Sequence, residues 1–504
     1  MKSITKTFGE VVANDAVDLK IKQGEIHAIV GENGAGKTTI MEILYGFYQA
    51  DSGDIKIFGK PVRIENSHKA IALGIGMVHQ HFMLIPPLTV TENIILGMEP
   101  IQPGGILKMQ EAVEKIRQIS EEYGLQIDPL ARVESLSVGL QQRVEILKAL
   151  YRGAEILILD EPTAVLTPLE VNSFFEILHR LEAQGKTIII ITHKLKEVLE
   201  VSNEVTVMRN GKKVGHLETR DATSESLATM MVGRDVLLRV SKKPAEPGKV
   251  LLKLENIIVD VDNQPKLKGV SLEVRSGEVF GIAGVEGNGQ TEIIEILTGL
   301  RPVGSGEVWF RDQNITNASA RKVKEHRIGH VPADRKAHGY VAPYSNAENL
   351  ILGFHYREPF CRKNGFFNFS EIEKNATQRI KENNVQPPFN DLPTSKLSGG
   401  NQQKLVVARE FSQNPDLLIV AQLTRGVDIG AIEFIHQRII DLRDEGKAIL
   451  LVSAELEEIR SLSDRAVVFY EGEITGEIDL ENYDEREIGL MMTGELKKPM
   501  LANP

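Results

Sequence analysis

Two short runs of residues have the types and spacing that phosphate and metal chemistry require. The first fits the phosphate-loop pattern of Gly, four residues, Gly, Lys and Ser or Thr; it reads Gly31-Glu32-Asn33-Gly34-Ala35-Gly36-Lys37-Thr38-Thr39. Its glycines let backbone N–H groups approach phosphate oxygens, and the start of the following helix adds its dipole. We expect Lys37 to neutralise β- and γ-phosphates and Thr38 to ligate Mg²⁺. An ordinary Gly-rich turn between a strand and a helix is the alternative, which the partner motifs disfavour.

The second run is an apolar strand over 156–159 that ends in two acids, Asp160 and Glu161. Asp160 is placed to hold Mg²⁺, directly or through water. Glu161 is placed to orient or deprotonate an attacking water. Read alone, the acids could equally be solvated carboxylates at a strand end. With the phosphate loop upstream, they predict hydrolysis of a nucleotide phosphate.

Two Ser-Gly segments each precede a predicted helix and could cradle a further anion. They read Leu136-Ser137-Val138-Gly139-Leu140-Gln141-Gln142 and Leu397-Ser398-Gly399-Gly400-Asn401-Gln402-Gln403. A Ser together with Gly backbone amides at a helix start can bind an anion. Each segment, taken alone, could also be a simple Ser N-cap.

The elements that must position these residues follow an alternating pattern. Residues 25–30 read as a buried strand before the phosphate loop, and residues 40–44 read as the first turns of a helix after it. Further along, the apolar run 188–191 follows a helical pattern over 169–183. Such alternation predicts an α/β fold in which helices cover a mainly parallel sheet.

The chain contains the same domain twice. The phosphate-loop glycines recur as Gly284 and Gly289 at an offset of 253, and the segment from Leu136 recurs from Leu397 at an offset of 261. The second copy therefore carries eight extra residues, which we expect partly around 360–369. A repeat of this length is a domain rather than a solenoid unit.

These offsets also set the expected boundaries. We expect a first domain over 1–236, a polar linker over 237–249 and a second domain over 250–504. The first copy has only the end of a leading strand at 3–8, whereas the second copy has this strand at 250–254.

Bulk properties limit the class of protein. At 504 residues the chain is too long for one core, and its net charge of −11 argues against a primary nucleic-acid or lipid-surface binder. Cys361 is the only cysteine, which rules out an internal disulfide framework and a cysteine zinc site and fits a reducing cytoplasm. We expect no signal peptide and no membrane-spanning helix, so another chain must supply any membrane part.

The combined motifs resemble those of the nucleotide-binding domains of ABC transporters, and the resemblance covers nearly the whole chain twice. It implies tandem duplicated P-loop NTPase domains, each with a mainly parallel sheet core, an antiparallel β part and a helical signature subdomain. Gln80 is similar to that family's Q-loop, His193 to its switch histidine and Phe8 to its adenine-stacking aromatic. The implied cofactors are ATP and Mg²⁺.

In that family each ATP lies between the phosphate loop of one domain and the signature of the other, so the resemblance implies two composite sites here. The first is complete. It would use Glu161, His193 and Gln80 for catalysis, Thr38, Gln80 and Asp160 for Mg²⁺, and Phe8, Gly31, Glu32, Asn33, Gly34, Ala35, Gly36, Lys37, Thr38, Thr39, Ser398, Gly399 and Gly400 for ATP.

The second composite site is degenerate. It would combine Gly284, Gly287, Gly289, Gln290, Thr291, Ala421, Gln422 and Ala454 with Ser137 and Gly139. Gln290 stands in place of the Lys, Ala421 and Gln422 in place of the two acids, and Ala454 in place of the His. Loss of the Lys and the metal-binding Asp removes charge pairs worth roughly 4 kcal/mol each at short range. We predict one hydrolytic site per chain and a second that binds nucleotide weakly or without turnover.

A fused ATPase pair is similar to the ATP-binding subunits of bacterial importers of the simple-sugar type. Within that type, strings such as 76–84, 160–168 and 425–434 resemble nucleoside importers served by a BMP-type lipoprotein. The resemblance implies an ATPase of the translocase class, peripheral at the cytoplasmic face of the cell membrane. Its implied partners are two transmembrane permease subunits and a lipoprotein or extracellular substrate-binding protein, with no nucleic acid and no direct membrane insertion.

Three alternatives remain at this point. The same role could serve a simple sugar such as ribose or galactose. A soluble fused ATPase of translation would usually have a long basic linker and two complete sites, and a DNA-repair ATPase would carry zinc cysteines. The short linker, the acidic balance and the single complete site disfavour the translation ATPase, and the single cysteine excludes the DNA-repair ATPase.

Overall fold

A computed structural model describes most of the chain. The described residues are 1–9, 11–79, 82–102, 105–163, 166–234, 242–261, 264–285, 287–423, 427, 429–482 and 484–498, without the side chains of 168, 169 and 429. The chain divides into two compact units, Met1–Val236 and Leu237–Pro504. Each unit is described below by itself.

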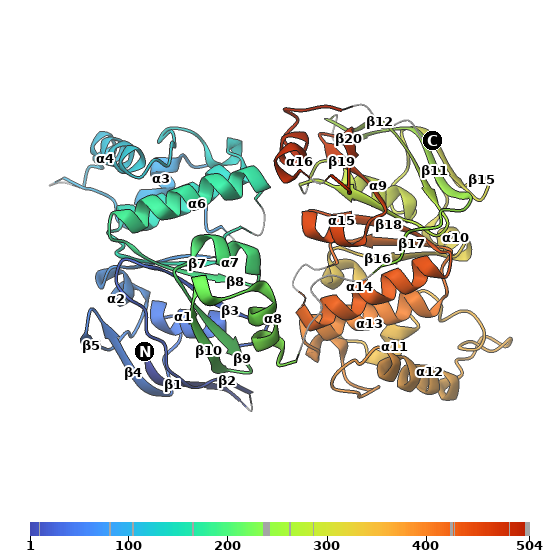
Figure 1. The fold of residues 1–504 in the computed structure, drawn as a ribbon, viewed down its shortest axis with the longest axis horizontal. Coiled ribbons are helices and arrows are strands. Elements are labelled where there is room, and N and C mark those ends of the chain that lie inside the picture. The colour runs from blue at the N-terminus through green and yellow to red at the C-terminus, as the bar shows by residue number, and fades with distance from the viewer. Residues whose placement is uncertain are drawn as a thin grey trace. The chain divides into compact units, whose positions relative to one another are not determined.

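The main sheet of unit 1 has six strands in the order β10-β9-β3-β8-β7-β6 (Figure 1). These are β3 (Ile26–Gly31), β6 (Ile75–Val78), β7 (Ile156–Asp160), β8 (Thr187–Thr192), β9 (Glu204–Arg209) and β10 (Lys212–Glu218). All neighbours pair in parallel except β10, which pairs antiparallel with β9. Every residue of β3, β6 and β8 is buried, as is typical of parallel strands covered on both faces.

A second sheet of unit 1 is antiparallel, in the order β2-β1-β4-β5. Its strands are β1 (Lys2–Phe8), β2 (Val11–Val17), β4 (Ser52–Ile57) and β5 (Lys60–Val62). The leading strand therefore forms despite its short start, and it pairs with both β2 and β4. At 7 residues it is shorter than its counterpart in unit 2, which has 12.

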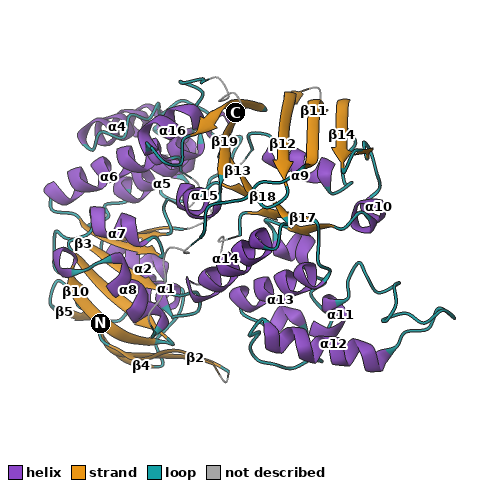
Figure 2. Ribbon diagram, turned by 45° about the vertical axis from the view of Figure 1, so that its right-hand side comes forward, coloured by secondary structure: helices purple, strands orange, loops and turns teal. Residues whose placement is uncertain are grey.

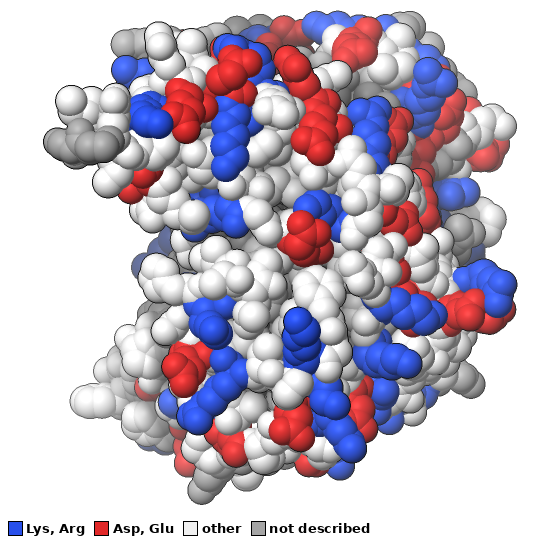
Figure 3. All heavy atoms as spheres, turned by 90° about the vertical axis from the view of Figure 1, so that its left-hand side faces the viewer, with Lys and Arg blue, Asp and Glu red and all other residues white. Residues whose placement is uncertain are grey.

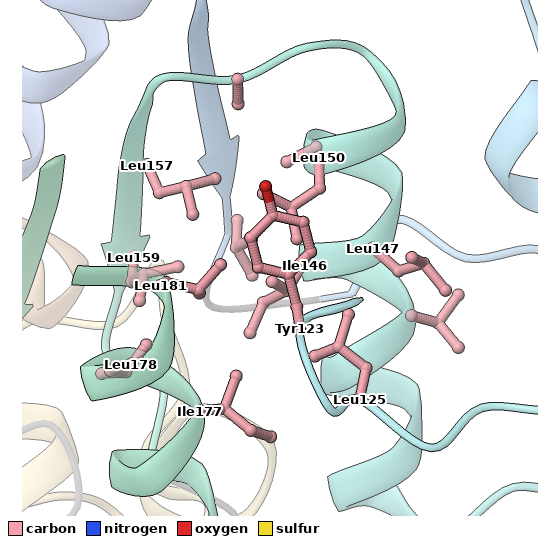
Figure 4. Packing of buried hydrophobic residues seen from close by; sticks show 14 of the residues in the cluster. Tyr123, Leu125, Ile146, Leu147, Leu150, Leu157, Leu159, Ile177, Leu178 and Leu181 are labelled. Atoms are coloured by element: carbon pink, nitrogen blue, oxygen red, sulfur yellow. The ribbon is translucent and has the colours of Figure 1, made fainter. Parts of the chain in front are cut away.

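The helices of unit 1 connect and cover these sheets (Figure 2). They are α1 (Lys37–Tyr45), α2 (Ser67–Ala72), α3 (Val90–Ile95), α4 (Met109–Glu122), η1 (Val133–Ser135), α5 (Val138–Tyr151), α6 (Pro168–Ala183), α7 (Leu195–Val201), η2 (Thr219–Asp221) and α8 (Ser224–Val232). One apolar cluster joins α5, α6 and β7, with Tyr123 and Leu125 inserted from the loop after α4 (Figure 4). This core fixes the strand that ends in Asp160 against the helix that begins at the first signature.

Unit 2 repeats the same architecture, as the internal offsets predict. Its sheets have the orders β12-β11-β14-β15 and β16-β17-β18-β13-β19-β20. The strands are β11 (Val250–Val261), β12 (Gln264–Arg275), β13 (Val279–Ala283), β14 (Ser305–Phe310), β15 (Gln313–Asn314), β16 (Ile328–Val331), β17 (Leu417–Ala421), β18 (Ala448–Ser453), β19 (Arg465–Tyr470) and β20 (Glu473–Ile478). The helices are α9 (Gln290–Leu297), α10 (Ala320–Glu325), η3 (Arg335–Gly339), α11 (Asn346–Leu350), α12 (Phe369–Glu382), η4 (Thr394–Lys396), α13 (Gly399–Ser412), α14 (Ile429–Asp444), α15 (Leu456–Leu462) and α16 (Glu485–Met492).

Two local features bear on the expected boundaries. The loop between α11 and α12 (351–368) is longer than the equivalent loop between α3 and α4 (96–108), so part of the extra length lies where we expected it. The described part of the expected linker, 242–249, is bonded to unit 2. Arg443 donates to the carbonyl oxygen of Lys243 at 2.9 Å, and the N–H of Gly248 donates to that of Ser276 at 2.8 Å.

Two further features of the structure are the distribution of surface charge and the character of the helices. On the face drawn in Figure 3, Lys and Arg are interspersed with Asp and Glu. Within the described ranges, no helix combines the length and the apolar character needed to cross a membrane.

Candidate functional site

The phosphate loop of unit 1 joins β3 to α1, and two of its glycines are required by the surrounding backbone. Gly36 has φ of 92°, and a Cβ there would lie 2.3 Å from the carbonyl oxygen of Ala13. A Cβ on Gly31 would lie 2.3 Å from the carbonyl oxygen of Met208. Among the described residues, no side chain caps the first N–H groups of α1, which are therefore suited to an anion.

Lys37 folds back over this loop. Its Nζ donates to the carbonyl oxygens of Gly31 at 2.7 Å and Glu32 at 3.0 Å, and its side chain is buried. Burial lowers the pKa of Lys37, against the opposing charges of Glu161 and Asp160. A phosphate in the loop would favour the charged ammonium, so the residue fits the role expected of it.

Asp160 ends β7 beside the loop. The Thr38 hydroxyl donates to its Oδ2 at 3.5 Å. Burial, followed by the neighbouring charge of Glu161, raises the pKa of Asp160 to about 6. A buried carboxylate and a hydroxyl oxygen form the oxygen-only donor set that Mg²⁺ prefers, and a cation there would relieve the cost of ionising Asp160.

Glu161 follows in a strained backbone conformation, with φ of 46°. Its N–H donates to the carbonyl oxygen of Ile191 at 2.8 Å, which ties the turn to β8. His193 Nδ1 lies 3.0 Å from Glu161 Oε1. Burial alone would raise the pKa of Glu161, but the hydrogen bond and charge of His193, with the charge of Lys37, bring the pKa below its ordinary value. Glu161 is thus held ionised and oriented, as a water-positioning group must be.

The same turn in unit 2 keeps the backbone and changes the chemistry. Gln422 has φ of 47°, and its N–H donates to the carbonyl oxygen of Val452 at 2.8 Å. In place of the histidine contact, Gln422 Oε1 accepts from the N–H of Ala454 at 3.2 Å. Ala421, in place of Asp160, is buried and has no group that could hold a metal. The strained turn therefore persists without the charges that would make it catalytic.

In unit 2, neutral side chains form hydrogen bonds to the backbone of their own phosphate loop. Gln290 donates to the carbonyl oxygen of Val285 at 3.1 Å and accepts from the N–H of Asn288 at 3.1 Å. Gly287 and Gly289 keep positive φ values of 96° and 107°. The backbone of the loop is thus preserved, while its lysine ammonium is absent.

Glu292 is a residue of this loop region that the motif search missed. It occupies the position of Thr39, at the offset of 253 that relates the two loops. Its Oε2 is buried without a hydrogen-bond partner among the described residues. An added carboxylate beside a phosphate cradle opposes anion binding, so this loop has lost one positive charge and gained one negative charge. The exposed Thr291 neighbours it.

Both signature serines cap the helices that follow them, so the simpler interpretation as N-caps is correct locally. Ser137 accepts from the N–H of Leu140 at 3.4 Å, and Ser398 accepts from that of Asn401 at 3.4 Å. A Cβ on Gly139 would lie 2.6 Å from Glu170 Oε1. Ser398 also accepts from Asn401 Nδ2 at 2.9 Å. Capping leaves the outward N–H groups of α5 and α13 open to a further role, which stays a prediction.

Two further residues expected at the first site in unit 1 are Phe8 and Gln80. Phe8 ends β1 with 41% of its surface exposed, and its ring meets that of Tyr48 edge-on at 5.0 Å. Gln80 lies outside the described residues. Asn14 was not found from the sequence. Its Nδ2 donates to the carbonyl oxygen of Gly36 at 3.1 Å, and it supports the loop from β2.

The structure therefore brings together, within unit 1, the loop lysine, the threonine hydroxyl, both acids and the histidine. This set can neutralise phosphate charge, hold a hard cation and position a water. Within unit 2 the corresponding positions all carry neutral side chains.

Comparisons with known proteins agree with this chemistry. Residues 14–164 and 267–422 match the protein family described as ABC transporter. The chain is 48% identical to the Nucleoside import ATP-binding protein NupA of Lactococcus lactis subsp. cremoris, over 98% of this chain and 97% of that protein. It is 48% identical to the Guanosine import ATP-binding protein NupO of Bacillus subtilis, over 99% and 98%. It is 45% identical to the Glucose import ATP-binding protein TsgD13 of Haloferax volcanii, over 98% and 95%.

Proposed function

The chain belongs to the ABC transporter family, whose ATP-binding proteins hydrolyse ATP to power transport, and from this premise we propose that it energises nucleoside import. One observation carries the proposal. Lys37, Asp160 and the Glu161–His193 pair meet around one phosphate loop, in a chain whose full length matches import ATP-binding proteins. Two relatives named for nucleoside and guanosine import, each 48% identical, favour nucleoside over sugar.

In the proposed first site, ATP phosphates lie along the loop 31–39, and Lys37 leaves its carbonyl partners to meet them. Thr38 and Asp160 would hold Mg²⁺, with Gln80 as a further ligand; the bound cation supplies neutralisation of β- and γ-phosphate charge. Glu161 orients the attacking water and accepts its proton, while His193 holds the Glu161 carboxylate in place. Ser398, Gly399 and Gly400 would complete the site with backbone amides.

We propose that the second site does not turn over. Gln290 leaves the phosphates without their lysine, Ala421 leaves the cation without its carboxylate, and Gln422 cannot accept a proton from water. Glu292 adds repulsion for an anion. With close charge pairs worth roughly 4 kcal/mol each, nucleotide affinity falls by orders of magnitude.

The partners follow from family membership and from one surface feature. Several large apolar side chains of unit 1 are about half exposed: Phe47, Tyr48, Met83, Ile85, Leu96 and Met98. The Phe47 ring stacks on the ring of His79 with centroids 5.5 Å apart, and exposed apolar side chains of this kind are typical of a protein-binding surface. We propose that they contact a cytoplasmic segment of one of two transmembrane permease subunits. The chain would then lie at the cytoplasmic face of the membrane, beneath a permease served by a lipoprotein or other solute-binding protein.

The test is the ATPase activity of the complex, reconstituted with its permeases in lipid vesicles. The complex is challenged with the solute-binding protein loaded with guanosine, with ribose or with glucose. Stimulation by the nucleoside alone supports the proposal. Stimulation by a sugar alone would instead establish the alternative, which the glucose-import relative at 45% identity favours. A complex carrying Glu161→Gln is the control, since it should assemble without turnover.

A further inference from the structure

The most unusual cluster of ionisable side chains outside the phosphate loop lies at the opposite end of the same strand. We name it the His–Glu corner; it consists of Glu25, His27, Glu204 and His216. These residues lie just before or within β3, β9 and β10, which are side by side in the sheet (Figures 1 and 2). Glu25, His27 and Glu204 are 7%, 0% and 6% exposed.

Carboxylates and imidazoles of the corner face one another. His27 Nδ1 lies 3.1 Å from Glu25 Oε1, and His216 Nε2 lies 3.2 Å from Glu204 Oε2. One ligand atom each from Glu25, His27 and Glu204 all lie within 4.8 Å of one another. The two rings are stacked, with centroids 5.7 Å apart and planes inclined by 17°.

A single hydroxyl holds the far sides of both rings. Thr206 Oγ1 lies 2.8 Å from His27 Nε2 and 3.2 Å from His216 Nδ1. It has one proton to donate, so at least one ring must donate its own N–H to Thr206. If that ring is neutral, its other nitrogen presents a lone pair to a carboxylate. A cation between that ring and the carboxylate, either an extra proton or a metal ion, would satisfy this arrangement.

At the equivalent corner of unit 2, the cation is the side chain of an arginine. The strand register places Phe280 and Arg465 where unit 1 has His27 and Glu204, and Glu477 where it has His216. Arg465 lies 3.5 Å from Glu278 and 3.6 Å from Glu477, over the ring of Phe280. Two acids surround one arginine.

Unit 1 keeps two acids at its corner but has no arginine among them. Its nearby cation is Lys22, which hydrogen-bonds Glu204 and whose side chain is 61% exposed. Unit 2 has Arg275 at the position of Lys22, so this outer cation is common to both copies and does not replace Arg465. Because Lys22 is solvated, it can withdraw from Glu204 at little cost.

We propose that the His–Glu corner binds one divalent transition-metal cation, and Zn²⁺ is the cation used to test this. One imidazole nitrogen and two carboxylates, from His27, Glu25 and Glu204, are a donor set that Zn²⁺ accepts, and a water or His216, which contacts Glu204, can take the fourth position. Thr206 is the outer group that fixes the ring orientation, as ligating histidines require. The cation would join β3, β9 and β10 at the end of the sheet away from the phosphate loop, where it stabilises unit 1 and takes no part in ATP hydrolysis.

The test uses the full chain, stripped with a chelator and titrated with Zn²⁺ against a colorimetric chelator in excess Mg²⁺. The decisive variant is the double substitution His27→Phe with Glu204→Arg, which introduces the Phe and Arg of the unit 2 corner and leaves Glu25, the counterpart of Glu278, to pair with the arginine. Two matched controls are Asp160→Asn, which disables the Mg²⁺ position, and His179→Ala, which removes an exposed His–Glu pair with a 3.2 Å contact on α6.

We expect one Zn²⁺ per chain in wild type and in both controls, and an affinity lower by about 100-fold or more in the double variant. X-ray absorption spectroscopy at the zinc edge should show nitrogen and oxygen ligands at about 2.0–2.1 Å from the metal and no sulfur ligand. Zinc should raise the melting temperature of wild type and leave that of the double variant unchanged. Equal zinc binding by wild type and the folded double variant would overturn the proposal, as would zinc binding that Asp160→Asn removes.

Discussion

Replacing Asp160 by Asn should stabilise the nucleotide-free protein while ending ATP turnover. The structure places this carboxyl at the end of β7, 8% exposed, where burial and Glu161 raise its pKa from 3.8 to about 6. An acid whose pKa is higher in the folded than in the unfolded state binds protons preferentially when folded. The folded state is therefore most favoured at low pH and loses stability as pH rises from about 4 through about 6.

The magnitude follows from the shift. About two pKa units correspond to about 3 kcal/mol at pH 7, which is the cost of holding Asp160 ionised in the fold. Asn has nearly the same shape and no charge, so it removes this cost. For a unit of this size, 1 kcal/mol moves the melting temperature by about 2–4 °C, so we expect a rise of about 6–12 °C. At pH 5 the advantage should shrink to about half.

The assay is differential scanning calorimetry of the nucleotide-free chain at pH 7.5 and pH 5. The single tryptophan, Trp309, lies in unit 2. A melting transition that changes Trp309 fluorescence is therefore assigned to unit 2, and a transition that leaves it unchanged is assigned to unit 1. Glu161→Gln is the matched control with the opposite sign. Because the pKa of Glu161 lies below its ordinary value, its ionised form stabilises the fold, and its removal should lower the melting temperature.

The reasoning would be refuted if Asp160→Asn melted at or below the wild-type temperature at pH 7.5. A rise of equal size at both pH values would also refute it, since the gain would then have no connection with ionisation of Asp160.

Three further outcomes are expected. Gly36→Ala should abolish ATP binding, measured by fluorescent nucleotide titration, because its Cβ would lie 2.3 Å from a β2 carbonyl oxygen; binding within a few-fold of wild type would contradict this. Gln290→Lys with Glu292→Thr should raise bound nucleotide per chain in rapid dialysis, and no rise would show that charge is not what limits the second loop. Arg443→Ala should lower the free energy of unfolding of unit 2 by about 1.5–3 kcal/mol in urea titrations, because the buried Arg443 bonds Asp464 at 2.9 Å and only Lys242, 3.3 Å from Asp464, would remain to balance that charge; a change under about 1 kcal/mol would argue against that ion pair.

Local spacing was enough to predict the parts of the site that lie on single elements. The positions of Gly31, Gly36 and Lys37 require a strand, a tight turn and a helix, and the structure has them in that order. The two sheets of each unit match the fold expected from the motifs and the repeat. These features depend on periodicity and backbone geometry, which a sequence expresses directly.

Contacts between distant elements were harder to predict. Asn14 supports the loop across 22 positions, and nothing in its neighbourhood distinguishes it from any other polar strand residue. Glu292 could have been found, because the offset of 253 aligns it with Thr39. The His–Glu corner depends on the register of three strands, and it stands out only when it is compared with the arginine corner of unit 2.

The central claim is that one of the two composite sites in each chain hydrolyses ATP. Its most direct test is the steady-state ATP turnover of the reconstituted complex with wild-type chain, with Glu161→Gln and with Gln422→Ala. We predict that Glu161→Gln removes turnover and that Gln422→Ala leaves it within about twofold of wild type, since Gln422 already lacks a group that accepts a proton. Turnover that survives Glu161→Gln, or that is lost with Gln422→Ala alone, would contradict the account.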